Sequence, residues 1–279
     1  MKKSSFLARV AWRRYPALAR LPIGDALWIR LAALFHRISG PSRLAWKDNL
    51  YCVEDSGRIL MVPRRVRLRY FLRGIQHRFD MLREEYGLSV PNWPRQGIAI
   101  DIGANIGEVS IILEELGLTV YSFEPDPTEF RALKKNRQSE DLCFDVALSE
   151  RNGRASLYLA NDSGDSSLIS NSGAPTTSGG SRTRTLDTAL REIGVELTSQ
   201  EIFFLKLEAE GAEPEILAGA TATLRKVRWI AVDAGFERGV EKRSPLPEIL
   251  KVLGPAGFEL VALQKRRTVA LFKRVDPAS

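Results

Sequence analysis

The sequence has little cysteine and no long hydrophobic run. Its 279 residues include two cysteines, Cys52 and Cys143, which can form one bridge at most and whose spacing resembles no disulfide or metal-binding framework. A reducing cytoplasm is therefore the expected compartment. Nowhere do about 18 consecutive apolar residues occur, so we expect no membrane-spanning helix. Arg9, Arg13 and Arg14 interrupt the first apolar residues, so we predict no secretion signal.

The hydrophobic content is higher than that of an intrinsically disordered chain. Hydrophobic residues make up 44% of the sequence, which is ordinary for a globular protein. The net charge of +7 is unevenly distributed, because residues 1–95 contain 19 Lys+Arg and 7 Asp+Glu, whereas residues 96–279 contain 22 and 27. We therefore predict a basic N-terminal extension over residues 1–95, helical with a short hairpin, and one large domain over residues 96–279.

An amphipathic helix is predicted near the N-terminus. Five apolar residues are spaced as on one helical face: Leu27, Leu31, Leu34, Phe35 and Ile38. Two interpretations stay open: this face packs against the main domain, or residues 1–38 contact anionic lipid at the inner membrane surface. Farther along, residues 50–54 and 58–62 predict a β-hairpin, and a helix is predicted to end near residues 84–87.

From Gly97 onward, short apolar runs alternate with amphipathic stretches, which predicts a doubly wound α/β sheet. The predicted strands are 98–102, 120–123, 142–147, 203–207 and 229–233, followed by a hairpin over 258–263 and 268–272. The predicted helices are 107–116, 127–136 and 214–224. The C-terminal hairpin indicates an antiparallel edge on a parallel sheet. Residues 161–182, rich in Ser, Thr and Gly, indicate either a surface loop or a lid over substrate.

The strongest local signal lies at residues 98–107, where an apolar strand ends in an acid and a glycine-bearing turn. Gly103 and Gly107 allow a ligand to approach the backbone, and the helix N-terminus beyond them offers N–H groups to an anion. Asn105 replaces the second glycine of the nicotinamide-dinucleotide pattern, which weakens that interpretation. Asp101 would repel a pyrophosphate but suits an ammonium group, such as that of S-adenosylmethionine. The alternative is that Asp101 only caps a turn.

A second group of polar residues follows the next two predicted strands. Glu124 lies 21 residues after the first glycine of the turn, where α/β nucleotide sites place a carboxylate for two ribose hydroxyls. Pro125 and Asp126 come next, and Asp126 either lies near the adenine or caps the following helix. Asp145 and Ala147 reach the same rim and either flank the adenine or simply end a strand. The spacing favours an adenosine-containing ligand.

Five motifs resemble, in the same order, those of the FkbM-type S-adenosylmethionine-dependent methyltransferases: DIGANIG at 101–107, FEPDP at 123–127, ALS at 147–149, TLD at 185–187 and FLKLEAEGAE at 204–213. The resemblance covers about residues 97–235. It implies a Rossmann-like class I methyltransferase fold, with a mostly parallel seven-stranded sheet and helices on both faces. It also implies S-adenosyl-L-methionine as the donor and O-methylation of a sugar or other small natural product. Members usually have aspartate where this chain has Glu208, whose carboxylate extends one methylene farther.

Three carboxylates at the ends of predicted strands are candidates for the catalytic base. Glu208 and Glu210 alternate on an extended chain, so both can face one pocket, and Asp233 ends the next strand at the same rim. An acceptor hydroxyl must lose a proton as it attacks, which calls for such a group. Mg²⁺ binding by these carboxylates is the alternative, but our prediction contains no metal. His36 and His77 lie outside the motif region and are not predicted as the base.

Two other functions stay open. One is an RNA methyltransferase that uses the basic N-terminal region. Nucleic acid is nevertheless not the expected partner, because no Pro-Pro-Tyr/Phe motif follows the strand that ends at Leu207, and aromatic residues are not interleaved with the basic ones. The other is a membrane-surface adaptor with a vestigial cofactor fold. The preferred prediction is a cytoplasmic O-methyltransferase with a small-molecule hydroxyl acceptor, and the sequence predicts no oligomeric state.

Overall fold

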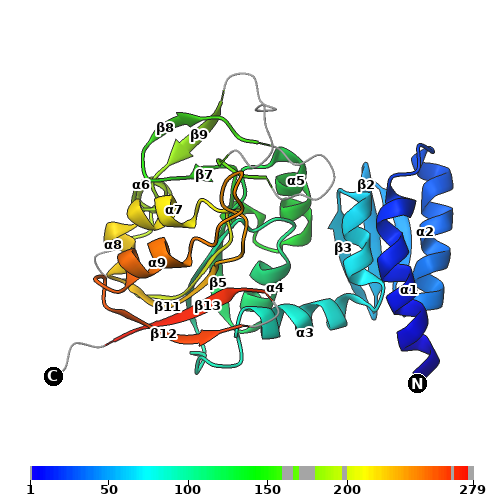
Figure 1. The fold of residues 1–279 in the computed structure, drawn as a ribbon, viewed down its shortest axis with the longest axis horizontal. Helices are drawn as coiled ribbons and strands as arrows, with labels where there is room; N and C mark the ends of the chain where they lie inside the picture. The colour runs from blue at the N-terminus through cyan, green and yellow to red at the C-terminus, as the bar shows by residue number, and fades with distance from the viewer. Residues whose placement is uncertain (1, 159–165, 170–179, 197–199, 265–266, 276–279) are drawn as a thin grey trace.

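The structure, a computed structural model, describes residues 2–158, 166–169, 180–196, 200–264 and 267–275. Figure 1 shows the N-terminal helices and a small sheet at one end of the molecule, and a larger sheet with helices at the other. Helix α3 (Ile75–Glu85) lies between these two parts (Figure 1). Its end agrees with the predicted helix end near residues 84–87.

The N-terminal part contains two helices, α1 (Lys2–Ala19) and α2 (Asp25–Ser39), and an antiparallel sheet in the order β1-β2-β3. Its strands are β1 (Arg43–Lys47), β2 (Leu50–Asp55) and β3 (Arg58–Val62), and the 3-10 helix η1 (Arg65–Phe71) follows. The predicted hairpin is confirmed as β2 and β3. Strand β1 was not predicted, because its turn uses Asp48 and Asn49, both with positive φ, in place of the glycine that usually signals such a hairpin.

The helix predicted around residues 27–38 is confirmed as α2, but the interpretation that its leucine face packs against the rest of the chain is wrong. Four of the five residues are exposed: Leu27, Leu31, Leu34 and Ile38. The helix instead buries Trp28, Ala32, His36 and Ser39. The buried imidazole of His36 is satisfied, since Tyr15 and Ser42 hydrogen-bond with its ring at 3.2 and 2.7 Å. The Trp28 side chain likewise donates to a backbone carbonyl at 2.9 Å.

The large sheet has seven strands in the order β12-β13-β11-β10-β4-β5-β6. They are β4 (Gly97–Ile102), β5 (Leu118–Phe123), β6 (Cys143–Phe144), β10 (Ile202–Leu207), β11 (Val227–Asp233), β12 (Phe258–Leu263) and β13 (Val269–Arg274). All pairs are parallel except those of β13, which runs antiparallel to β11 and β12. The predicted Rossmann-like class I methyltransferase fold with an antiparallel C-terminal edge is confirmed.

One predicted strand and one predicted helix are each divided in two. The strand over 142–147 is β6 and then β7 (Ala147–Leu148), because β7 leaves the large sheet to pair with β9 (Ser181–Arg184) in a small sheet that includes β8 (Gly153–Ala155). The helix over 214–224 is α7 (Glu213–Ala218) and α8 (Thr221–Leu224). It breaks at Gly219, where a Cβ would lie 2.4 Å from a backbone oxygen of Ser149.

Buried side chains cover both faces of the large sheet. On one face, α4 (Glu108–Glu115), α5 (Pro127–Asn136) and the N-terminal part share one apolar cluster with the strands. On the other face, α6 (Leu186–Glu192), α7, α8 and α9 (Leu246–Leu253) form a second cluster, and η2 (Glu140–Leu142) precedes β6. The carboxyl ends of β4, β5, β10 and β11 therefore meet at one edge of the sheet, which is where α/β folds bind ligands.

Candidate active site

A cavity of about 440 Å³ lies at the carboxyl ends of these parallel strands. The sheet contributes residues 102–105, 123–125, 146–148 and 208–210 to its lining. The N-terminal part contributes Trp12, Arg67, Tyr70, Arg78 and Tyr86. The cavity is therefore built by both parts of the chain. From the segment predicted as a loop or lid, residues 166–168 line the cavity, and residues 181 and 182 belong to strand β9 of the small sheet. Residues 161–165 and 170–179 lie outside the described residues.

The turn after β4 is closely packed between β5 and β10. Gly103, Asn105 and Gly107 all have positive φ, and a Cβ at Gly103 would lie 1.8 Å from the carbonyl oxygen of Glu208. Gly103 and Asn105 line the cavity, whereas Gly107 caps α4 outside the lining residues. Each backbone N–H from residue 103 to 107 already donates within the protein. The amides of the turn itself are therefore already paired, and the prediction that the helix N-terminus beyond Gly107 binds an anion stays a prediction.

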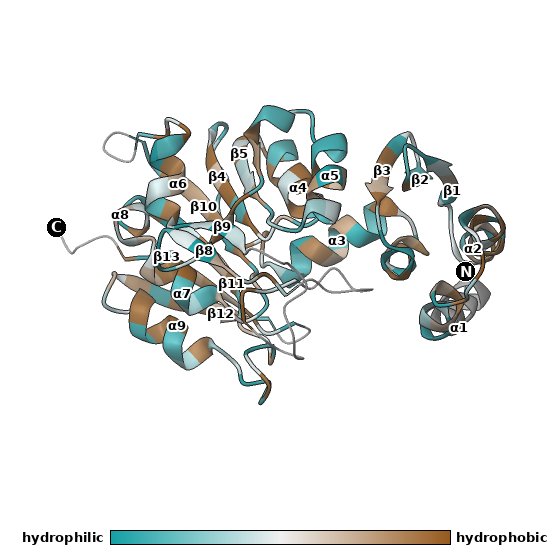
Figure 2. Ribbon diagram, turned by 90° about the horizontal axis from the view of Figure 1, so that it is seen from above, coloured by the Kyte–Doolittle hydropathy of each residue, from teal (hydrophilic) through white to brown (hydrophobic). Residues whose placement is uncertain are grey.

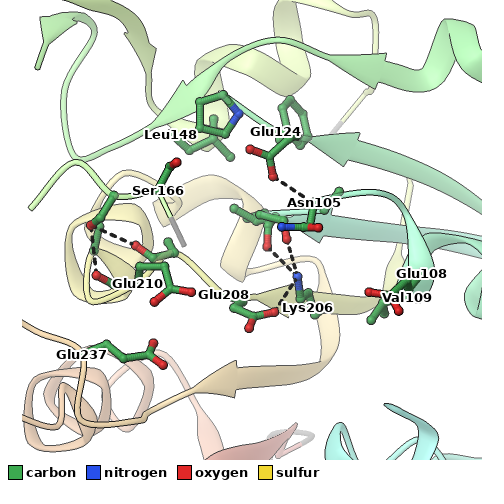
Figure 3. Close-up of a pocket in the computed structure, with 18 of the residues that line it drawn as sticks. Asn105, Glu108, Val109, Glu124, Leu148, Ser166, Lys206, Glu208, Glu210 and Glu237 are labelled. Atoms are coloured by element: carbon green, nitrogen blue, oxygen red, sulfur yellow. Dashed lines mark hydrogen bonds and ion pairs between the residues drawn. The ribbon is translucent and has the colours of Figure 1, made fainter. Parts of the chain in front are cut away.

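Glu124 occupies the position predicted for a ribose-binding carboxylate. One of its oxygens accepts the backbone N–H of Asn105 and the other that of Asp126, both at 2.8 Å. Burial raises the pKa of Glu124 to about 8. Because a carboxylate has about four acceptor positions, two remain for a ligand. Glu124 and Pro125 both line the cavity, and Figure 3 shows Glu124 across the open space from Glu208.

Of the other three residues predicted near the nucleoside, only one lies among the described residues that line the cavity. Ala147 lines the cavity. Asp126 is not among the described lining residues, because its carboxylate caps α5 by accepting the Thr128 N–H at 2.8 Å and pairs with Arg64 at 2.7 Å. Asp145 is exposed and also lies outside the lining. Of the two predicted alternatives for Asp126, the geometry places it as the helix cap.

Asp101 lies behind the cavity wall. It is fully buried, with Lys206 Nζ 3.1 Å from one carboxylate oxygen and the Ser110 hydroxyl donating to the other at 2.6 Å. Lys206 in turn donates to the Gly103 carbonyl at 2.6 Å and lies 3.3 Å from Glu208. The ion pair with Lys206 therefore takes the place of the predicted direct contact with a ligand ammonium group.

Two of the predicted catalytic carboxylates are held in ion pairs. Glu208 accepts the Tyr86 hydroxyl and pairs with Arg267 and Lys206. Burial alone would raise the pKa of Glu208, but these two cations hold it well below its usual range. Asp233 lies 2.9 Å from Arg267, and burial followed by the charge of Glu208 raises its pKa. The structure therefore joins Glu208 and Asp233 through Arg267.

The third predicted carboxylate, Glu210, lies beside Glu237. Glu210 has a positive φ, in a turn held by the Glu213 carboxylate, which accepts the N–H groups of Ala209 and Gly211 at 2.8 and 3.2 Å. Glu237 lines the cavity and hydrogen-bonds with Glu210, and burial followed by the charge of Asp233 raises its pKa to about 7. Figure 3 shows Glu208, Glu210 and Glu237 gathered on one side of the cavity.

Sequence reasoning missed Tyr86, Glu237 and Arg267. Tyr86 lies directly before the glycine that ends α3, and Arg267 lies in the turn between β12 and β13. Glu237 follows Asp233 by four residues, and this proximity to a predicted strand end is the one sequence signal among the three. In the described part of the chain, no group of three or more His, Cys, Asp or Glu residues has an arrangement that would hold a metal ion.

The chain is similar to known methyltransferases. It is 28% identical over 225 residues to the 2-O-methyltransferase NoeI of Sinorhizobium fredii, which covers 73% of this chain and 89% of that protein. Among solved structures it is similar to magnesium protoporphyrin IX methyltransferase from Synechocystis with bound SAM, at 13% identity and a TM-score of 0.39, covering 72% of this chain and 79% of that one. It is also similar to the Methanococcus jannaschii fibrillarin pre-rRNA processing protein, at 12% identity and a TM-score of 0.39, covering 84% and 88%.

The family comparison covers most of the sheet and most of the cavity lining. The sequence model described as the methyltransferase FkbM domain matches residues 101–260, which is more than half of the chain. This range begins at Asp101 and includes Glu124, Glu208 and Glu237. The protein therefore belongs to the FkbM methyltransferase family.

Proposed function

We propose that this enzyme transfers a methyl group from S-adenosyl-L-methionine to a hydroxyl of a sugar or another small natural product. The observation that carries the proposal is the acidic side of the cavity. Among the described residues that line the cavity, six are acidic and four are basic: Glu85, Glu108, Glu124, Glu208, Glu210 and Glu237 against Arg67, Arg78, Lys206 and Arg267. An excess of negative charge favours a cationic ligand such as a sulfonium and disfavours the pyrophosphate of a dinucleotide.

The residues of the cavity fit this donor. Glu124 keeps acceptor positions for two ribose hydroxyls, and the apolar side chains of Val146 and Leu148 lie beside it for a base. The absence of a side chain at Gly103 lets the turn that lines the cavity pack directly against the backbone of Glu208. When bound, S-adenosylmethionine supplies an electrophilic methyl group.

Proton acceptance is placed at Glu237, with Glu210 as its hydrogen-bond partner. A general base works best when its pKa lies near the working pH, and the pKa of Glu237 is about 7. Glu208 is a poorer base, because Lys206 and Arg267 stabilise its charged form. We assign Glu208 and Asp233 to positioning Arg267 and the adjacent backbone.

An oxygen atom as acceptor is supported by the relative that is named a 2-O-methyltransferase. A sugar-like acceptor is supported by the wall opposite the sheet, where Trp12 and Tyr70 lie with ring centroids 5.2 Å apart. Pockets for small molecules combine such aromatic surfaces with a few polar groups, and sugars present both C–H faces and hydroxyl edges. The free cysteines Cys52 and Cys143 support a cytoplasmic location.

Thermal unfolding with candidate ligands tests the donor assignment. S-adenosylhomocysteine should stabilise the protein, by about 2.7 kcal/mol at a ligand concentration 100 times its Kd, whereas NADH should have no effect. Stabilisation by NADH alone would replace the proposal with an oxidoreductase. Methyl-labelled S-adenosylmethionine incubated with sugar and phenol acceptors then tests the acceptor class by transfer of label.

A further inference from the structure

Helix α2 has two apolar faces, and only one of them is covered by the protein. The uncovered face, here called the α2 stripe, consists of Leu27, Leu31, Leu34 and Ile38, each 38% to 53% exposed. Their spacing places them along one side of the helix. Figure 2 shows α1 and α2 at one end of the molecule, away from the large sheet. No helix in the described part of the chain is long and apolar enough to cross a membrane.

The charge beside the α2 stripe is positive. Arg30 and Arg37, seven residues apart, are exposed on the same helix and follow the stripe along one flank. On α1, Arg13 and Arg14 are exposed as well. Within residues 10–40 the one acidic residue is Asp25, whose carboxylate is occupied by Arg65 at 2.6 Å. The surface therefore combines leucine and isoleucine with arginine and has no comparable acidic component.

The apolar and basic side chains of this surface favour an anionic lipid bilayer over a second copy of the chain as the binding partner. In a symmetric dimer the same patch meets itself, so Arg30 and Arg37 of one copy would approach those of the other without acidic partners. A bilayer with anionic lipids offers both missing components, since its acyl region takes the apolar side chains and its phosphates pair with the arginines. Helix α2, with 15 residues, is about 22 Å long, which suits a helix lying in the interface.

We propose that α2 lies on an anionic lipid bilayer, with the α2 stripe in the acyl boundary and Arg30 and Arg37 at the headgroups. The inference depends on the surface of α2 alone and not on the proposed methyl transfer. It deepens the alternative that residues 1–38 contact a membrane, because the structure identifies the side chains that face outward. Membrane binding by α2 does not require the protein to be an adaptor without catalytic activity.

Vesicle flotation of the full-length protein tests the proposal. The parent protein should float with phosphatidylcholine–phosphatidylserine vesicles and should not float with phosphatidylcholine alone. The double variant Leu31→Glu/Leu34→Glu should lose flotation, and Arg30→Gln/Arg37→Gln should partition about 30-fold more weakly. The matched control Leu260→Glu changes a leucine on β12 with 43% exposure and should float like the parent.

The variants change exposed side chains, so they should keep the parent far-UV circular dichroism and the thermal shift given by S-adenosylhomocysteine. A failure of methyl transfer would then leave the flotation result unaffected. Equal binding to neutral vesicles, or loss of binding in Leu260→Glu, would contradict the proposal. A parent protein that fails to float but sediments as a dimer, and becomes monomeric in Leu31→Glu/Leu34→Glu, would assign the stripe to a second copy instead.

Discussion

The N-terminal part and the sheet part of this enzyme carry opposite charge, and they meet through ion pairs. Residues 1–95 have a net charge of +12 from 19 basic and 7 acidic residues, against −5 from 22 and 27 for residues 96–279. We propose residues 95 and 96 as the boundary between them. Across it, Arg64 pairs with Asp126 and Glu129 at 2.7 and 2.6 Å, and Arg78 pairs with Glu108 at 2.8 Å.

The arginines of the N-terminal part include two groups with different surroundings. Five arginines of the N-terminal part pair with acids of the sheet part: Arg58, Arg64, Arg67, Arg78 and Arg83. Arg30 and Arg37 instead face outward on α2. A basic region therefore need not indicate an external partner, since part of its charge matches the acidic surface on which it folds. Arg30 and Arg37 are the cations that we assign to an external partner.

The largest expected effect tests whether the catalytic base lies in the sheet part. Glu237→Gln should lower kcat by about 10² to 10⁴-fold, because a glutamine cannot accept the acceptor's proton. In the parent, kcat/KM should rise with pH through about 7, since the base must be deprotonated to act. Initial rates from pH 5.5 to 8.5 measure both. Glu210→Gln serves as the comparison, and a larger loss there would make Glu210 the base.

The next effect tests whether the interface between the parts holds the fold together. Arg78→Met should lower the free energy of unfolding by about 3–5 kcal/mol, because it leaves the buried carboxylate of Glu108 with only the more distant Arg67 at 3.6 Å. Urea unfolding at pH 7 gives this difference. Adding Glu108→Gln should recover part of the loss, and no recovery would mean that packing of Arg78 matters more than its charge.

A pH effect tests the role of Glu124 in the sheet part. Ribose hydroxyls donate to its deprotonated form, so binding of S-adenosylhomocysteine releases a proton. Because the pKa of Glu124 is about 8, affinity should rise by about tenfold per pH unit up to that pH and then level off. In Glu124→Gln, affinity should be low and independent of pH. Calorimetric titrations between pH 6 and 9 measure both, and a flat profile in the parent would remove Glu124 from the ribose site.

The smallest effect concerns an exposed ion pair across the same boundary. Arg83 pairs with Glu115 at 2.8 Å, but both side chains are about 30% exposed. Arg83→Met should therefore change the free energy of unfolding by less than about 1 kcal/mol. A loss as large as that of Arg78→Met would show that burial does not distinguish the two pairs.

Features encoded by neighbouring residues could be predicted from the sequence, whereas contacts between distant residues could not. The helix over 127–136 was predicted with its observed ends, since Asp126 and Pro127 are local start signals. Tyr86 and Glu208 are 122 residues apart, and their contact has no periodic signature. The two interpretations of the leucine face of α2 stayed open for a similar reason, because the partners of His36 that help to bury the other face lie outside the helix.

Trp12, Tyr70 and Tyr86 line the cavity from outside the segment that carries the family motifs. We propose that donor binding depends on the motif segment and acceptor choice in part on these three residues, which would place the two properties in separate stretches of the gene. On this proposal, the first 95 codons could diverge or recombine without loss of donor binding. Relatives that share the motifs but differ in their N-terminal segments are accordingly expected to modify different acceptors.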